Sequence, residues 1–163
     1  MRKLFGGSLG IAVALFVGAL NVAAQPGIPR FNDYPVNERY TGKTAPLVLS
    51  RAAREFRTRL RQAAAEKPNF AGRFIVTTWG CGTECVYGAI IDAKTGQVFM
   101  LPFSLCCWGP GTGRDDNFKP LEFRLGSNLI VLSGARDEKD GDYATRFYRF
   151  QNHRLVLVKT ITH

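Results

Sequence analysis

The 163-residue sequence has little of what most enzymes use for catalysis. It contains two histidines, His153 and His163, and no Gly-x-Ser-x-Gly or His-Glu-x-x-His pattern that would pair a histidine with a nucleophile or a metal. The glycines from Gly109 to Gly113 lack the Gly-Lys-Ser/Thr ending of a phosphate-binding loop and the strand-to-helix context of a dinucleotide fingerprint. The sequence therefore does not support a Ser/His/Asp enzyme or a nucleotide-binding protein, and we predict no cofactor.

Long apolar runs are absent after residue 20. The one long run, Leu4–Leu20, follows Arg2 and Lys3 and leads into the small residues Ala23-Ala24. A charged start, a short apolar core and a small-residue exit are typical of a secretory signal peptide, which we assign to residues 1–24. A membrane anchor is the alternative, but about twenty residues are marginal for a span. We therefore expect a mature chain without a membrane span, located in the periplasm or secreted.

Acidic residues are scarce, at 13 against 22 Lys and Arg. Removal of residues 1–24 takes away two basic residues and leaves 139 residues with a net charge of about +7. An exported basic domain favours an anionic envelope component or an acidic protein partner, whereas export separates it from nucleic acid. Solubility alone is the alternative explanation for the basicity, and the oligomeric state stays open.

Only four cysteines are present, Cys81, Cys85, Cys106 and Cys107, and an oxidising compartment makes disulfides the default. Three pairings are open. Because a bond between the adjacent Cys106 and Cys107 would be strained, we expect at least one link between the 81–85 turn and the 106–107 loop. Cys-x-x-x-Cys with an adjacent pair is not zinc-ribbon spacing, so no metal is predicted, with copper(I) as the remaining metal alternative.

The rest of the chain divides into an extended segment and one domain. Residues 25–49 contain four prolines and no helical or strand period, which predicts extended backbone along the domain surface or a disordered arm. Residues 50–163 are predicted to form a single α+β domain.

The first predicted element of this domain is an amphipathic helix that begins after Ser50 and ends before Pro68. Its apolar residues recur at spacings of three and four; they are Ala52, Ala53, Phe56, Leu60, Ala63 and Ala64. The other face carries five arginines: Arg51, Arg54, Arg57, Arg59 and Arg61. Arg51 and Arg54 stand near the helix N-terminus, where the helix dipole disfavours cations. We therefore predict that these two bind an anionic ligand or a partner's carboxylate, with a solvated face as the alternative.

Seven segments with the composition of strands follow, joined by turns without intervening helices. They cover residues 74–79, 86–91, 97–101, 121–125, 129–132, 143–150 and 154–161. Residues 102–120 are predicted to be irregular. The fold class is therefore α+β, an antiparallel β meander of about seven strands with one N-terminal amphipathic helix packed on it.

The turn from Trp79 to Cys85 is the predicted binding site. A disulfide-closed loop loses little entropy on contacting a partner, and Trp is a frequent interface anchor. A link to the 106–107 loop would bring Trp79 and Trp108 into one neighbourhood. The polar partners there would be Glu84, Arg114 and Asp115. The alternative is that both tryptophans pack on the disulfides as core.

Several short motifs add a resemblance: Asp33-Tyr-Pro-Val36, Tyr40-x-Gly42, Ala45-Pro46, Pro68-Asn-Phe-Ala-Gly72, Trp79-Gly-Cys-Gly-Thr83-x-Cys85 and Ile91-Asp-x-x-Thr-Gly96. The chain resembles a family of small secreted bacterial proteins of unknown function, and the Trp-Gly-Cys-Gly-Thr-x-Cys core is the most specific part of the likeness. The resemblance implies export and a single domain, and it carries no catalytic role.

These observations favour a non-catalytic binding or envelope-associated protein. The alternative is a small envelope hydrolase that acts on glycan through carboxylates near Trp79 and Trp108, which would need two of them at a set separation across a cleft.

Overall fold

The computed structural model describes residues 27–107 and 119–163. The predicted signal peptide, residues 1–24, lies outside the described residues, as do the predicted site residues Trp108, Arg114 and Asp115. Within the described ranges, no helix combines the length and the apolarity needed to cross a bilayer.

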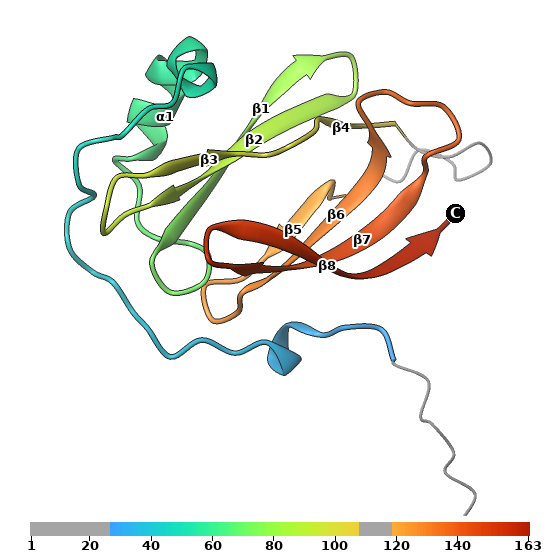
Figure 1. The fold of residues 1–163 in the computed structure, drawn as a ribbon, viewed down its shortest axis with the longest axis horizontal. Helices are drawn as coiled ribbons and strands as arrows, with labels where there is room; N and C mark the ends of the chain where they lie inside the picture. The colour runs from blue at the N-terminus through green and yellow to red at the C-terminus, as the bar shows by residue number, and fades with distance from the viewer. Residues whose placement is uncertain (1–26, 108–118) are drawn as a thin grey trace, which may run out of the picture.

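The described chain is mainly antiparallel sheet with one short helix (Figure 1). A 3-10 turn, η1 (Phe31–Asp33), comes first, and a 3-10 segment, η2 (Ala52–Phe56), continues directly into α1 (Arg57–Ala63). The strands are β1 (Phe74–Gly82), β2 (Cys85–Asp92), β3 (Val98–Met100), β4 (Leu105–Cys106), β5 (Leu121–Phe123), β6 (Leu129–Arg136), β7 (Ala144–Gln151) and β8 (Arg154–Thr162). Every strand pairing is antiparallel.

The strand count and order correct the prediction of a seven-stranded meander. The described residues form an eight-stranded sheet in the order β1-β2-β4-β6-β7-β8, with β3 paired to β2 and β5 paired to β6. The unpredicted strand, β4, lies in the segment that the sequence marked as irregular. Two residues are too few to show an alternating pattern. The strand exists because Leu105–Cys106 pairs with β2 on one side and with β6 on the other.

The helix is also shorter than predicted and is not N-terminal, since described residues 27–51 precede it. The Ser50 hydroxyl accepts a hydrogen bond from the Ala53 N–H at 3.2 Å, so the chain does begin to coil at the predicted cap. Five residues then form the 3-10 segment, and α1 adds seven. The buried Leu60 and Ala63 pack with Ile75 and other residues of β1 and β2.

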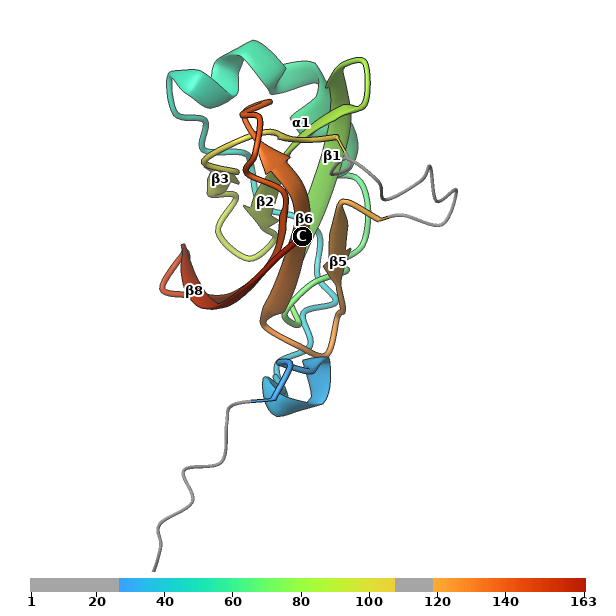
Figure 2. The ribbon, with the colours of Figure 1, turned by 90° about the vertical axis from the view of Figure 1, so that its right-hand side faces the viewer.

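The sheet has two halves that enclose the main core. Strands β1 to β3 form one half and β5 to β8 the other, and β4 is the only described strand that pairs with both. Phe74 and Ile90 from the first half meet Ile130, Leu132 and other residues from the second in one buried cluster. Because successive residues of a strand point to opposite faces, Ile75 instead faces the helix. Figure 2 shows the molecule from the side, with α1 at one end and η1 at the other.

A second connection joins the two halves just before Phe74, where β1 begins. This is the end of the β1–β2 hairpin that lies furthest from its turn. The backbone N–H groups of Ala71 and Gly72, just before β1, donate to the carbonyls of Arg124 at 3.3 Å and Leu125 at 2.7 Å. Arg124 and Leu125 lie between β5 and β6. Backbone hydrogen bonds therefore join the halves at two places, at β4 and at this contact.

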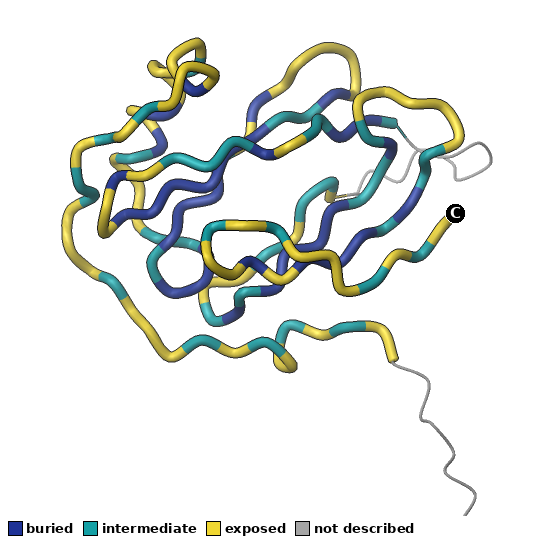
Figure 3. The backbone as a smooth tube through the Cα atoms, viewed as in Figure 1, coloured by how far each residue is buried: buried dark blue, intermediate teal, exposed yellow. Residues whose placement is uncertain are grey.

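The segment from residue 27 to residue 49 runs along the domain in mostly extended backbone (Figure 3). Hydrogen bonds hold it at intervals: the Val36 N–H donates to the Gly126 carbonyl at 3.0 Å, and the Tyr40 N–H donates to the Gly72 carbonyl at 2.9 Å. The Val48 N–H donates to the Gly96 carbonyl at 2.8 Å. This segment brings Tyr40 and its neighbours beside the chain that leaves the helix, more than 20 residues further along.

Candidate functional site

The two disulfides are both local, which corrects the expected cross-link. Cys81 pairs with Cys85 across the β1–β2 turn, with Cα atoms 5.1 Å apart, and Cys106 pairs with Cys107. The hairpin brings the first pair within ordinary disulfide range. Cys107 adopts a φ of +56°, a left-handed conformation in which the adjacent pair is accommodated. The expected link between the turn and the loop is therefore wrong. The two segments are nevertheless neighbours, since Cys85 and Cys106 are directly opposed partners of β2 and β4.

Trp79 lies in the core between the helix and the sheet. Its indole is 7% exposed, and its ring centroid is 4.8 Å from that of Phe56 and 5.7 Å from that of Tyr87. Packing therefore accounts for its position, but Trp79 packs on these aromatic rings and not on the disulfides, whose cysteines Cys85 and Cys106 belong to a separate buried cluster. Glu84, by contrast, is exposed at the tip of the turn, with a φ of +56°.

Glu84 and Asp92, the carboxylates at the two ends of β2, do not form the pair that the hydrolase alternative requires. Glu84 directly precedes β2 and Asp92 ends it. An eight-residue strand separates its ends by roughly 23 Å, whereas glycosidase carboxylates stand about 5–9.5 Å apart. Among residues 27–107 and 119–163, no group of three or more His, Cys, Asp or Glu side chains is arranged to hold a metal ion.

Five exposed arginines lie close together in the sequence on the helical segment and just before it. We call the five arginines between residues 51 and 61 the arginine face: Arg51, which immediately precedes η2, and Arg54, Arg57, Arg59 and Arg61. All five are exposed, and none makes an ion pair or a side-chain hydrogen bond with another described residue. Arg54, Arg57 and Arg61 follow one another at spacings of three and four, so they share one side of the helix. Arg51 and Arg54, the two predicted binders, thus belong to a larger surface.

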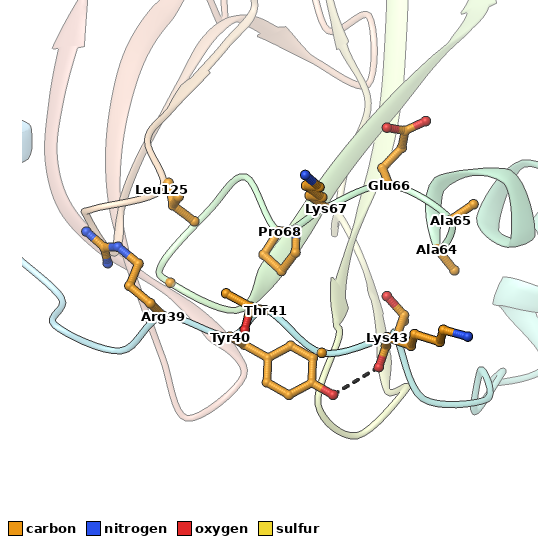
Figure 4. Close-up of a pocket in the computed structure, with 13 residues that line it drawn as sticks. Arg39, Tyr40, Thr41, Lys43, Ala64, Ala65, Glu66, Lys67, Pro68 and Leu125 are labelled. Carbon is orange, nitrogen blue, oxygen red and sulfur yellow. Dashed lines mark hydrogen bonds between the residues drawn. The ribbon is translucent and has the colours of Figure 1, made fainter.

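The chain that leaves α1 forms one wall of a cleft of about 660 Å³ (Figure 4). Residues 39–44 form the facing wall, and Leu125 closes one side. The Tyr40 ring lies along this wall, and its hydroxyl donates to the Lys43 carbonyl at 2.9 Å. The charged side chains that line the cleft are Arg39, Lys43, Glu66 and Lys67. With three cations against one carboxylate, we call it the basic cleft.

Gly72 allows the N-terminal segment to pack closely against the turn before β1. Gly72 has a φ of +78°, and a Cβ there would lie 2.1 Å from the Glu38 carbonyl oxygen. Only glycine allows the 38–40 backbone to lie directly on the 71–72 turn. The cleft is therefore built into the backbone and does not depend on one side-chain rotamer. Sequence patterns missed it, because its walls are 20 and more residues apart and neither wall carries a ligand motif.

A network of charged and polar side chains that includes Glu38 lies outside the basic cleft. The Asp92 carboxylate is fully buried, with Oδ2 3.0 Å from Arg73 Nη2 and 3.5 Å from His153 Nε2. Arg73 Nη1 is also 3.4 Å from a Glu38 carboxylate oxygen. The His153 ring stacks on Phe99 with centroids 4.6 Å apart. This network fastens the N-terminal segment, the β2–β3 turn and the β7–β8 turn together beside a cavity of about 430 Å³.

A second ionic cluster ties the ends of β6 and β7. Asp142 Oδ2 accepts from Arg136 Nε at 2.8 Å, and Asp142 Oδ1 accepts from Arg146 Nη2 at 2.6 Å. The hydrogen bonds from the Arg136 guanidinium lower the pKa of Asp142 to about 2, with the Arg146 charge acting in the same direction. Because the Arg146 side chain is only 5% exposed, this cluster is a structural element of the second half of the sheet.

In comparisons with family models, with curated proteins and with solved structures, no match to this chain was found.

Proposed function

We propose that this protein is an exported, non-catalytic binding protein that holds an anionic polysaccharide of the cell envelope. The observation that carries the proposal is the arginine face, five exposed guanidinium groups that have no ion-pair partner among the described residues. Guanidinium groups bind carboxylate, sulfate and phosphate oxygens through paired hydrogen bonds. A row of them without internal partners is suited to a ligand that carries repeated negative charges.

Export is the second part of the proposal. The signal-like residues 1–24 support it, and two disulfides persist most readily in an oxidising compartment. The resemblance to small secreted bacterial proteins, carried by the Trp-Gly-Cys-Gly-Thr-x-Cys core, supports the same location. The ligand is then a component of the envelope or of its surroundings.

The burial of the helix's apolar residues and the presence of the basic cleft favour a polysaccharide ligand over a membrane surface. A helix that lies on a bilayer inserts apolar side chains, whereas this helix packs its apolar stripe against β1 and β2. None of the exposed large apolar residues of the described chain belongs to η2 or α1, although one of them, Leu125, lines the basic cleft; they are Ile28, Val48, Leu125, Val156, Leu157 and Val158. The basic cleft, about 660 Å³ in volume, lies within the usual range for small-ligand sites of roughly 300–1,000 Å³ and can take a sugar unit beside Tyr40.

The test uses polygalacturonate, a linear polyuronate, as the probe and neutral dextran as its uncharged counterpart. Binding would be measured by titration calorimetry on the mature protein. We expect Arg54→Gln/Arg57→Gln/Arg61→Gln to bind polygalacturonate about tenfold more weakly, because three exposed charge contacts are lost. Wild-type affinity should also fall steeply with added salt, and dextran should not bind.

The matched control removes three exposed cations from the other half of the sheet: Lys139→Gln/Arg149→Gln/Arg154→Gln. Both triple variants have the same net charge. If the control weakens binding as much as the arginine-face variant does, the attraction is a property of net charge, and the proposed site is wrong. Equal binding of dextran would refute the anionic ligand.

A further inference from the structure

The four cysteines form a single cluster at the β4 connection. Cys85 and Cys106 are opposed on β2 and β4, and both pack with Ala135 of β6 in one buried group, with Cys107 and Tyr143 at its margin. We propose that the two disulfides act as one thiol–disulfide exchange site, which a small thiol attacks at Cys81 and in which the electron pair passes from Cys85 to Cys106. The product is a Cys85–Cys106 cross-link between β2 and β4.

The difference in exposure among the cysteines indicates which sulfur an external thiol attacks first. Cys81 is exposed, whereas Cys85 and Cys106 are 5% and 3% exposed. An external thiolate can therefore reach the Cys81 sulfur, and the leaving group is Cys85. A thiolate is disfavoured in apolar surroundings, so burial slows the release of the Cys85 sulfur as a leaving group, but once formed the Cys85 thiolate is a strong nucleophile towards the neighbouring Cys106 sulfur.

Neither observed disulfide closes a long loop of the chain, as strongly stabilising disulfides do. The two disulfides span sequence separations of 4 and 1, whereas a Cys85–Cys106 bond would span 21 residues. The restriction that a disulfide places on the unfolded chain grows with the length of the closed loop. The Cys85–Cys106 bond therefore constrains the chain more than either local disulfide does by itself, and its formation also releases Cys107 from a pairing that accompanies a left-handed φ of +56°.

The steps balance with two molecules of a monothiol such as glutathione. The first thiolate bonds to the Cys81 sulfur and breaks Cys81–Cys85, which gives a mixed disulfide and the Cys85 thiolate. The Cys85 thiolate bonds to the Cys106 sulfur and breaks Cys106–Cys107, which leaves the Cys107 thiolate to take a proton. The second glutathione thiolate attacks the glutathione sulfur of the mixed disulfide, which releases glutathione disulfide and leaves Cys81 as a thiol. One protein disulfide is reduced, and two glutathiones are oxidised.

The experiment is glutathione treatment of the folded, oxidised protein, followed by N-ethylmaleimide, trypsin and mass spectrometry. Trypsin cuts after Arg73, Lys94 and Arg114, so the two cysteine pairs fall in separate peptides, 74–94 and 95–114. We expect these peptides to become joined, with maleimide on Cys81 and Cys107 and the bond between Cys85 and Cys106. Cys85→Ser should give no joined peptide.

Two outcomes would overturn the proposal. One is independent reduction, in which the peptides stay separate while maleimide accumulates on either pair. The other is a mixture in which Cys81 joins the second peptide as often as Cys85 does, which is the pattern of random reshuffling. Circular dichroism of the treated protein must retain the β-sheet signal, so that exchange in the folded state is what is measured.

Discussion

Replacement of Asp142 by Asn tests the ionic cluster at the ends of β6 and β7. The carboxylate accepts hydrogen bonds from both Arg136 and Arg146, and the Arg146 side chain is 5% exposed. Without the carboxylate, the Arg146 guanidinium would retain two backbone acceptors, the carbonyls of Gly134 and residue 142, each at 3.0 Å. A buried charge would then be left without a counter-ion, which is among the costlier single changes.

The pKa of Asp142 gives the magnitude. Lowering the pKa from 3.8 to about 2 corresponds to about 2 kcal/mol of stabilisation at neutral pH. Breaking a buried pair costs about 3–5 kcal/mol, and the Asp142 side chain is 17% exposed, which lessens that figure. We therefore expect Asp142→Asn to lower the free energy of unfolding at pH 7 by about 2–4 kcal/mol.

The dependence on pH distinguishes the ion pair from simple packing. Because the folded-state pKa lies below the unfolded value of 3.8, the stabilisation is present above about pH 4 and is lost as the pH falls towards about 2. Urea unfolding of the wild type and of Asp142→Asn should therefore give free energies that converge between pH 4 and pH 2. A gap that stays constant over this range, or a variant as stable as the wild type at pH 7, would refute the reasoning.

Asp140→Asn is the matched control for that experiment. Asp140 is exposed, and its carboxylate contacts the Tyr143 hydroxyl at 3.0 Å and the neighbouring Gly141 N–H at 2.9 Å. We expect its effect to stay within about 0.5 kcal/mol, as is usual for exposed substitutions.

Two further substitutions test the basic cleft and the core. Gly72→Ala should lower stability by about 2 kcal/mol or more and weaken polygalacturonate binding, because the new Cβ would meet the Glu38 carbonyl. Gly141→Ala, at a φ of +77° with open space around it, should cost only about 1 kcal/mol in urea unfolding and leave binding unchanged; equal losses would contradict the cleft argument. Trp79→Phe should lower stability by about 1–2 kcal/mol while polygalacturonate affinity stays within about twofold; a large loss of affinity with unchanged stability would restore Trp79 as a ligand contact.

The main strands could be predicted because their signals are local. β1, β2 and β6 to β8 each contain a run of β-branched, aromatic and apolar residues bounded by turn formers. β4 could not be predicted, since two residues gain strand geometry only from partners 20 and about 30 positions away. The disulfide pairing failed for a related reason. We expected a disulfide between the adjacent Cys106 and Cys107 to be too strained to form. The bond does form, with Cys107 in a left-handed backbone conformation.

The candidate site shows the same division between local and distant information. The arginine face could be seen in the sequence, because five arginines fall opposite an apolar stripe. The basic cleft could not, since it arises where residues 39–44 lie against the chain that leaves α1. Asp92 stands at the start of the β2–β3 turn, where its Oδ1 accepts a hydrogen bond from the Lys94 N–H at 2.9 Å. Its ion pair with Arg73 depends on the pairing of β1 with β2, which the composition of the turn does not specify.

The two connections between the halves of the sheet have a mechanical consequence. The Ala71–Gly72 contact with Arg124 and Leu125 borders the basic cleft, while β4 carries one of the exchangeable cysteines. A polysaccharide bound in the basic cleft would contact the residues around the Ala71–Gly72 connection. A Cys85–Cys106 bond would make the β4 connection covalent. If both proposals hold, ligand binding would act on one backbone connection between the halves, and the thiol balance of the surroundings would act on the other.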